Sequence, residues 1–284
     1  MYLMHKKQFL VYKIFIMKKI LTILFILSAF TSNAQRTMFG GNNNYVAPPP
    51  PPFVAPPITT GEVTNGLLLY LNAGNTSSYS GTGITWYDLS GQDNHGTLRA
   101  NNSGSLPVFQ NGSFYFNGSS SYVSIVSSVI PNSGSFTVST WAKMSSGRYA
   151  EMINTRNASS VTGFLLTSTG SDIRAQINNP SVNQYAYSGT HSTIQDNTWH
   201  LITMTVDVTT LSMKAYVDNI YINSGTFPAG SLVGQQYFSI GWDYAWNGDP
   251  FYLGYIATVS VYNYALSGTD VTTNFNALKT RFGL

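Results

Sequence analysis

The stretch from Gly241 to Pro250 combines the side chains that a sugar-binding site needs. It holds two of the five tryptophans in the 284-residue chain, one tyrosine, two aspartates and one asparagine. Sugar rings stack on Trp and Tyr, and sugar hydroxyls bond to Asp and Asn, so this mixture suits a carbohydrate. In the alternative interpretation, the tryptophans only cover the end of the core. The predicted ligand-contacting residues are Trp242, Asp243, Tyr244, Trp246, Asn247 and Asp249.

Calcium is the second ligand that this stretch would suit. Asp243, Asn247 and Asp249 carry oxygen atoms, of which calcium takes six to eight. Another oxygen-rich segment, residues 88–94, is better explained by turns, because Asp and Asn side chains bond to their own backbone there. We therefore expect no resident cofactor and keep calcium as an alternative.

Residues for catalysis are scarce. Glu62 and Glu151 are the only glutamates in the chain, and Glu151 has no acidic neighbour within four residues. Hydrolysis of a glycosidic bond needs two carboxyl groups roughly 5–10 Å apart, and nothing singles out Asp243 and Asp249 as such a pair. The absence of cysteine excludes disulfides, thiolate metal sites and thiol catalysis. His200 begins a long predicted strand, where we expect a structural role. The sequence therefore predicts a protein that is not an enzyme.

The elements that must position these side chains are short strands. From Gly66 onward, runs rich in Tyr, Phe, Val, Ile and Thr alternate with clusters of Gly, Ser and Asn, which is typical of an all-β sandwich. In one strand, Phe136 and Val138 lie on one face and Trp141 lies on the other, so Trp141 is expected to cover a second surface. The predicted strands are residues 67–71, 114–116, 122–126, 136–144, 150–155, 164–167, 172–177, 199–208, 211–218, 237–242 and 255–262.

One hairpin turn and one helix complete the prediction. Asp218-Asn219 lies between two β runs, and both residues tolerate the positive φ of a tight turn. Ser267 can cap a helix, and Asp270 three residues later completes a capping box. We expect this helix to run to about Leu278, with basic residues near its C-terminal end.

Five groups of motifs follow one another from Gly66 to the end of the chain. They are residues 66–75 (GLLLYLNAGN) with 86–91 (WYDLSG) and 95–98 (HGTL), 114–118 (FYFNG) with 122–123 (YV), 136–143 (FTVSTWAK), 199–200 (WH) with 216–218 (YVD), and 238–241 (FSIG) with 254–256 (GYI) and 261–267 (VYNYALS). Their number and order resemble bacterial laminin-G-like jelly-roll domains of the concanavalin A-like lectin and glucanase superfamily. The resemblance implies a two-sheet antiparallel jelly-roll sandwich, here with one short C-terminal helix, and loops at its rims that are available for ligands.

The resemblance alone does not determine a function, because this fold carries lectins, adhesion modules and glycosidases. Many relatives that bind calcium have an acidic residue before the Tyr of the second aromatic strand, whereas Ser121 precedes Tyr122 here. The glucanases of the superfamily use a strand with two glutamates and an aspartate between them, which this chain lacks. The resemblance therefore favours a binding module without calcium.

The N-terminal residues predict export. Five lysines precede the apolar run from Ile20 to Phe30, whose 11 residues are too few to span a bilayer but suit a signal-peptide core. Residues 32–34 (SNA) form a small-x-small cleavage site before Gln35. We expect a signal peptide over residues 1–34, with Met17 as an alternative start, and a protein that is secreted, periplasmic or at the cell surface.

Residues 35–65 predict an Asn- and Pro-rich linker before a domain over residues 66–284. Five consecutive prolines, Pro48 to Pro52, favour a stiff polyproline II spacer. Removing the signal peptide takes away five of 14 basic residues, which leaves nine against 11 acidic ones and a net charge of −2. Nucleic-acid binding needs clustered Lys and Arg, so we expect no nucleic-acid partner. No second apolar run is long enough to span a membrane in the mature chain.

These observations predict a secreted, non-catalytic module that binds a carbohydrate or surface polymer. The expected partner is a glycan or surface polysaccharide. Two alternatives stay open: a glycoside hydrolase of the same superfamily, and a structural or adhesion protein that binds another protein.

Overall fold

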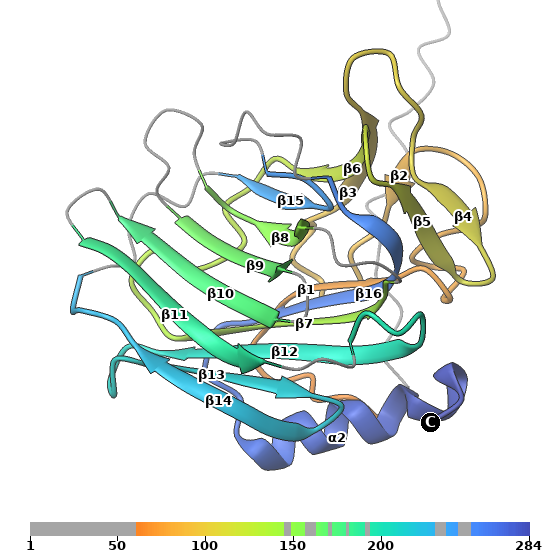
Figure 1. Cartoon of the computed structure of the whole chain (residues 1–284). Coiled ribbons are helices and arrows are strands. Elements are labelled where there is room, and N and C mark those ends of the chain that lie inside the picture. Colours follow the sequence, from red (N-terminus) through yellow and green to blue (C-terminus); the bar gives the residue numbers. More distant parts are fainter. Residues whose placement is uncertain are drawn as a thin grey trace, which may run out of the picture. The chain divides into compact units, whose positions relative to one another are not determined.

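The computed structural model describes residues 61–144, 149–156, 163–169, 172–179, 182–190, 194–230, 237–243 and 251–284. Two antiparallel sheets pack face to face in this part of the chain (Figure 1). The predicted all-β jelly-roll sandwich is therefore confirmed. The predicted signal peptide and the proline run lie outside the described residues and stay predictions.

We call the first layer the helix-side sheet. Its strands are β1 (Leu67–Asn72), β4 (Val108–Gln110), β5 (Ser113–Asn117), β7 (Phe136–Lys143), β12 (Trp199–Asp207), β13 (Ser212–Val217), β14 (Ile220–Thr226) and β16 (Leu253–Tyr262). They run in the order β14-β13-β12-β7-β16-β5-β4, and β1 also pairs with β16. The last strand, β16, thus joins the two halves of this sheet.

We call the second layer the far sheet. Its strands are β2 (Thr85–Trp86), β3 (Gly96–Ala100), β6 (Ser121–Ile125), β8 (Tyr149–Asn154), β9 (Gly163–Thr169), β10 (Asp172–Asn179), β11 (Val182–Thr190) and β15 (Phe238–Ile240). Their order is β11-β10-β9-β8-β15-β6-β3-β2. Every predicted strand overlaps an observed one, whereas β2, β3, β4, β11 and β14 were not predicted.

The hydrophobic core lies between the sheets and follows the alternation of the strands. In β7, Phe136, Val138 and Ala142 belong to this core. Trp141 lies on the opposite face, in a separate cluster with Leu201 of β12 and Leu278. Trp141 thus covers a second surface, as the alternation predicted.

That second surface is covered by the C-terminal helix α2 (Gly268–Leu278), which is followed by a 3-10 turn, η1 (Lys279–Phe282). Ser267 and Asp270 form the predicted capping box, with Asp270 N donating to Ser267 Oγ at 3.2 Å. Trp141 stacks on Phe275 and Phe282 at centroid distances of 5.8 and 4.2 Å. The helix therefore packs on the outward face of the helix-side sheet (Figure 1).

The residues just before Gly66 already belong to the packed unit. Val63 N donates to Asn274 Oδ1 of α2 at 2.8 Å, and Tyr262 Oη donates to the Val63 carbonyl at 3.1 Å. Glu62 accepts a hydrogen bond from Tyr70 Oη. Packing therefore begins at least four residues before the predicted domain start, because side chains of α2 and β16 hold this segment.

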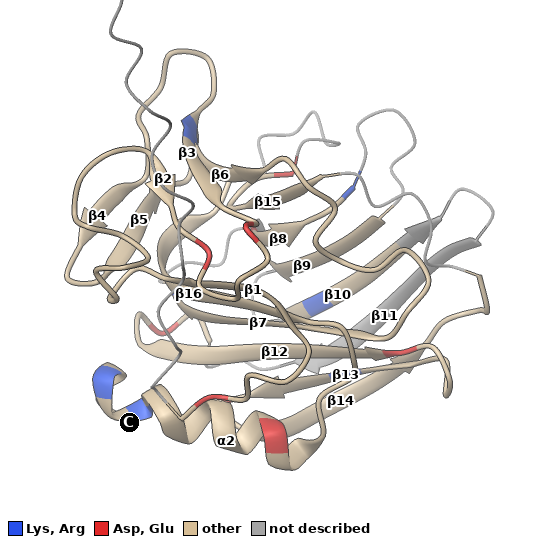
Figure 2. Ribbon diagram, turned by 180° about the vertical axis from the view of Figure 1, so that it is seen from behind, with Lys and Arg blue, Asp and Glu red and all other residues tan. Residues whose placement is uncertain are grey.

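The described elements carry few charges (Figure 2). Only 9% of all residues in the chain are Asp, Glu, Lys or Arg. Within the described ranges, no helix is long and apolar enough to cross a membrane.

Candidate ligand-binding face

The far sheet turns a row of side chains away from the core. Directly paired residues of antiparallel strands point to the same face. Ser239 of β15 pairs with Asn154 of β8 and with Ser124 of β6, while their neighbours Phe238 and Ile125 enter the core. The outward row across six strands is Gln176, Leu165, Asn154, Ser239, Ser124 and Thr97. Five of its six members are polar. Asn154 and Ser239 are buried, whereas Gln176, Ser124 and Thr97 are partly exposed and can hydrogen-bond to a ligand.

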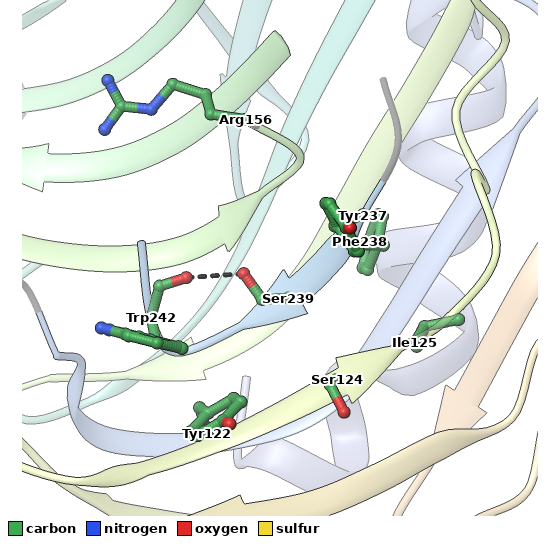
Figure 3. Close-up of a pocket in the computed structure, with 8 residues that line it drawn as sticks. All are labelled: Tyr122, Ser124, Ile125, Arg156, Tyr237, Phe238, Ser239 and Trp242. Carbon is green, nitrogen blue, oxygen red and sulfur yellow. Dashed lines mark hydrogen bonds between the residues drawn. The ribbon is translucent and has the colours of Figure 1, made fainter. Parts of the chain in front are cut away.

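A hollow of about 220 Å³ opens where β6 and β15 lie side by side (Figure 3). We call it the Trp242 hollow. Its lining combines four aromatic residues, two serines and one arginine. The lining residues are Tyr122, Ser124, Ile125, Arg156, Tyr237, Phe238, Ser239 and Trp242.

Trp242 is held in place by ring contacts and by the turn that precedes it. Its ring stacks on Phe251 with centroids 5.4 Å apart and planes 2° apart, and lies 4.7 Å from the Tyr122 ring. Gly241 before it has φ of +86°, and a Cβ there would lie 2.6 Å from the Phe116 ring, so only glycine fits. Ser239 Oγ donates to the Trp242 carbonyl at 2.6 Å (Figure 3). The indole is thus half-buried and fixed at the edge of the hollow.

Asp243 lies behind the hollow and not in it. Its side chain is fully buried and forms an ion pair with Arg156, whose side chain lines the hollow. Asn154 Nδ2 donates to Asp243 Oδ1 at 2.6 Å, and Arg156 N donates to Asn154 Oδ1 at 2.7 Å. Asp243 thus orients Arg156 instead of meeting solvent. The guanidinium also supplies, beside Asp243, the positive charge that calcium would bring.

The structure covers only part of the predicted site. Trp242 lines the hollow and Asp243 supports it, whereas the other predicted ligand-contacting residues lie outside the described ranges and stay predictions. Sequence reasoning missed Tyr122, Tyr237 and Arg156. The alternation of Tyr122 and Ser124 in β6 could have placed both on one outward face. Those outside the described ranges are Tyr244, Trp246, Asn247 and Asp249.

Glu151 of β8 is a second buried carboxyl group near Arg156. It pairs across the far sheet with Thr167 and has no exposed surface. Burial raises the pKa of Glu151 to about 8, although the charge of Arg156 and a contact with Thr167 lower it in part. The group is therefore protonated at neutral pH. Neither carboxyl group, Glu151 or Asp243, reaches solvent in this structure.

The oxygen-rich segment around Asp88 is turn structure, as the sequence indicated. Asp88 is buried, and its carboxylate accepts hydrogen bonds from the backbone N–H groups of Tyr70, Ser90 and Asn94 at 2.8, 2.9 and 3.0 Å. Ser90 Oγ donates a fourth at 2.7 Å. The carboxylate therefore fixes the loop to β1.

His200 has the structural role that its position predicted. Its Nδ1 lies 2.6 Å from Asp218 Oδ2, and its Nε2 lies 2.9 Å from Thr198 Oγ1 and 3.3 Å from Asp196 Oδ1. Burial alone would lower the pKa of His200, but the hydrogen bonds and charges of Asp218 and Asp196 outweigh it, so the pKa is raised. The ring links the start of β12 to the β13–β14 turn, where Asp218 and Asn219 have the predicted positive φ of +53° and +73°.

The two-sheet antiparallel sandwich is a jelly-roll fold, and one of its outward faces carries the Trp242 hollow. The chain belongs to the concanavalin A-like lectin/glucanases superfamily, whose laminin-G-like family model matches residues 117–272. The resemblance of the motifs is therefore confirmed. No curated protein matches the chain in sequence.

Solved structures with the same fold include binding domains of botulinum neurotoxins. The binding domain of botulinum neurotoxin serotype D/C has a TM-score of 0.58 and 14% identity, over 76% of this chain and 53% of that chain. Binding domains of botulinum neurotoxin DC in complex with rat synaptotagmin II and with SialylT have TM-scores of 0.56 and 0.55. Both are 15% identical, over 76% of this chain and 52% of those chains. The chain thus spans about half the length of these relatives, and the likeness concerns the fold.

Proposed function

We propose that this chain is an exported, non-catalytic module that binds a carbohydrate or surface polysaccharide in the Trp242 hollow. The observation that carries the proposal is the composition of the hollow. A fixed, half-buried indole lies beside Tyr122, Tyr237 is 52% exposed, and serine hydroxyls lie between them. A few polar groups around apolar rings are what a sugar ring needs for orientation and stacking.

The neighbouring folds support the class of function. The toxin structures with this fold described above are binding domains, and one of them forms a complex with SialylT, which fits a glycan ligand. Another binds rat synaptotagmin II, which keeps a protein partner as the alternative. Export rests on the Lys-flanked apolar run and the cleavage site before Gln35. N-terminal sequencing of the exported protein should find Gln35 first, and a retained Met17 would contradict export by cleavage.

Affinity electrophoresis in gels containing a β-glucan, a xylan or an α-mannan tests the hollow. We expect the parent to be retarded in at least one gel, and Trp242→Ala to bind about tenfold or more weakly, because central aromatic residues carry much of the affinity. Tyr237→Ala, at an exposed ring, gives a second measurement with little effect on folding. Tyr221→Ala, at a ring that is 51% exposed on edge strand β14, is the matched control and should bind like the parent.

Each outcome of this experiment bears on the proposal. Trp246 lies outside the described ranges and is expected to extend the platform, so Trp246→Ala should also weaken retention while the domain stays folded. If Trp242→Ala and Tyr237→Ala are both retarded as strongly as the parent, the hollow is not the binding site. A parent that binds none of the polymers but binds a protein would favour the adhesion alternative.

The hydrolase alternative has one observation in its favour. Glu151, with its raised pKa, and Asp243 both lie near the same guanidinium, and hydrolysis needs one protonated and one ionised carboxyl group. Against it, both carboxyl groups are fully buried. Release of reducing sugars by the parent, abolished in Glu151→Gln, would favour the hydrolase over the binding module.

A further inference from the structure

A second row of side chains crosses the outward face of the helix-side sheet. Lys143 of β7 pairs with Trp199 of β12 on one side and with Tyr255 of β16 on the other. Tyr255 in turn pairs with Tyr115 of β5. The neighbouring residues Ala142 and Ile256 enter the core, so all four side chains of the row point away from it.

These side chains border a pocket of about 190 Å³, here called the Lys143 pocket. Its lining residues are Gln110, Asn111, Ser113, Lys143, Trp199 and Tyr255. The Trp199 and Tyr255 rings are 6.3 Å apart and inclined at 58°, so they form two walls. The Lys143 ammonium lies 5.8 Å from the centre of the Tyr255 ring. The pocket thus combines aromatic walls, one cation and neutral polar groups.

The walls of the pocket are fixed by contacts outside it. Asn111 and Gly112 form a two-residue hairpin turn with φ of +48° and +74°, and Ser113 Oγ donates to the Gln110 carbonyl at 2.8 Å. Arg281 donates to the Gly112 carbonyl at 2.5 Å. Phe282 packs against Trp199 at a centroid distance of 4.8 Å. A ligand would therefore meet a site that is already formed, which lowers the entropy cost of binding.

Lys143 has no ionic partner in this pocket. Among the described residues, the ion pairs involve Arg156, His95 and His200, and none brings a carboxylate to Lys143. Its ammonium group is a compact cation on a flexible stem, and it can donate up to three hydrogen bonds. A half-buried cation without a counter-ion, beside aromatic rings, favours a ligand that brings its own negative charge.

We propose that the Lys143 pocket binds the uronate unit of an acidic polysaccharide. Lys143 would pair with the sugar carboxylate, Trp199 and Tyr255 would contact the ring, and Gln110, Asn111 and Ser113 would bond to hydroxyls. At about 190 Å³ the pocket is smaller than the roughly 300 Å³ at which pockets for larger ligands begin, so it takes one sugar unit.

This pocket is distinct from the Trp242 hollow in position and in chemistry. The two sites lie on the outward faces of different sheets. One domain could then engage two polymer chains at once, which raises the overall strength of attachment without a new contact at either site. The inference does not depend on the ligand of the Trp242 hollow.

Affinity electrophoresis in polygalacturonate, alginate and hyaluronate gels tests the pocket. The parent should be retarded in at least one gel, less so at about 1 M salt, which screens charges beyond about 3 Å. Lys143→Gln should bind about tenfold more weakly, the loss of one charge-assisted hydrogen bond. Lys143→Arg should retain most of the affinity. Asn111→Asp, which tolerates the same positive φ, places a negative charge at the rim and should also weaken binding.

Two controls separate this site from the rest of the molecule. Lys214→Gln, at an exposed lysine of β13 outside the pocket, removes the same charge and should bind like the parent. Trp242→Ala should leave retention in the uronate gels unchanged. Methyl esterification of the polygalacturonate removes the carboxylate charge and should abolish binding wherever that polymer retards the parent.

Three results would overturn the inference: no retardation of the parent in any uronate gel, equal retardation of Lys143→Gln and the parent, or equal loss in Lys214→Gln and Lys143→Gln. The neutral-polymer gels are a separate measurement. A negative result in the uronate gels therefore does not contradict the proposal for the Trp242 hollow. A negative result in the neutral-polymer gels does not contradict the proposal for the Lys143 pocket.

Discussion

The outward faces of the two sheets differ in polarity and in whether other parts of the chain cover them. On the helix-side sheet, Trp141, Leu201 and Ala257 form an apolar surface, and α2 covers it. On the far sheet the corresponding row is mostly polar, and the buried ion pair of Arg156 and Asp243 lies beside it. An apolar face needs additional chain to exclude water, whereas a polar face can remain in contact with water and ligands. The two proposed sites therefore lie on the far sheet and at the uncovered end of the helix-side sheet.

The largest loss of stability should come from a substitution in the apolar surface that α2 covers. Trp141→Ala removes the ring on which Phe275 and Phe282 stack, and large-to-small changes of buried aromatics cost about 3–5 kcal/mol of unfolding free energy. Trp242→Ala, at a half-buried ring, should cost at most about 2 kcal/mol. Urea unfolding of both variants measures the difference. Equal losses would mean that the two faces contribute alike to stability.

A somewhat smaller change in stability should come from Glu151, the buried carboxyl group of the far sheet. The pKa of Glu151 rises from an ordinary value of 4.5 to about 8 on folding. The folded state therefore holds this proton more tightly than the unfolded state. The associated stability is complete below about pH 4.5 and is lost as the pH rises through about 8. Glu151→Gln keeps the group neutral, so at pH 9 its unfolding free energy should exceed that of the parent by a few kcal/mol.

Urea unfolding at pH 4 and pH 9 checks this expectation. At pH 4 the Glu151→Gln variant and the parent should unfold alike, since both groups are then neutral. The same pH dependence in Glu151→Gln and the parent would contradict the assignment.

The smallest effect should come from the segment that precedes the packed unit. Glu62 and Val63 contact Tyr70, Tyr262 and Asn274, so the covering of the helix-side sheet includes them. Deleting residues 35–60 should leave these contacts intact and change the unfolding midpoint very little. A loss above roughly 1–2 kcal/mol, which is large beside typical net stability, would show that the proline run also packs on the domain.

The fold could be predicted because its signals are local. Alternation in β7 assigned Phe136 to the core and Trp141 to the opposite face, and Ser267 with Asp270 marked the start of α2. The strands that were not predicted are short or polar. β2 has two residues, and edge strand β14 exposes most of its side chains. Such strands depend on pairing with their neighbours more than on their own sequence.

The candidate sites could be predicted only in part, because they depend on cross-strand register. The aromatic composition around Trp242 predicted a site after β15, and the Trp242 hollow lies there. Nothing local indicated that Asp243 would be paired with Arg156, which is 87 positions earlier in the chain. Likewise, Lys143 and Tyr255 become neighbours only through the pairing of β7 with β16. Which charges pair and which residues line a pocket depend on the tertiary structure. The spacing of residues in the sequence does not determine them.

The position of β16 in the chain determines when the helix-side sheet can be completed during folding. This strand, residues 253–262, pairs with β7 along one edge and with β5 and β1 along the other, yet it follows all three of these strands in the chain. A nascent chain that ends before Leu253 therefore exposes unpaired edges on three strands, which can pair with other chains. Contacts between such distant segments also slow folding. Assembly of the helix-side sheet is thus a late event, completed only after residues 253–262 have been synthesised.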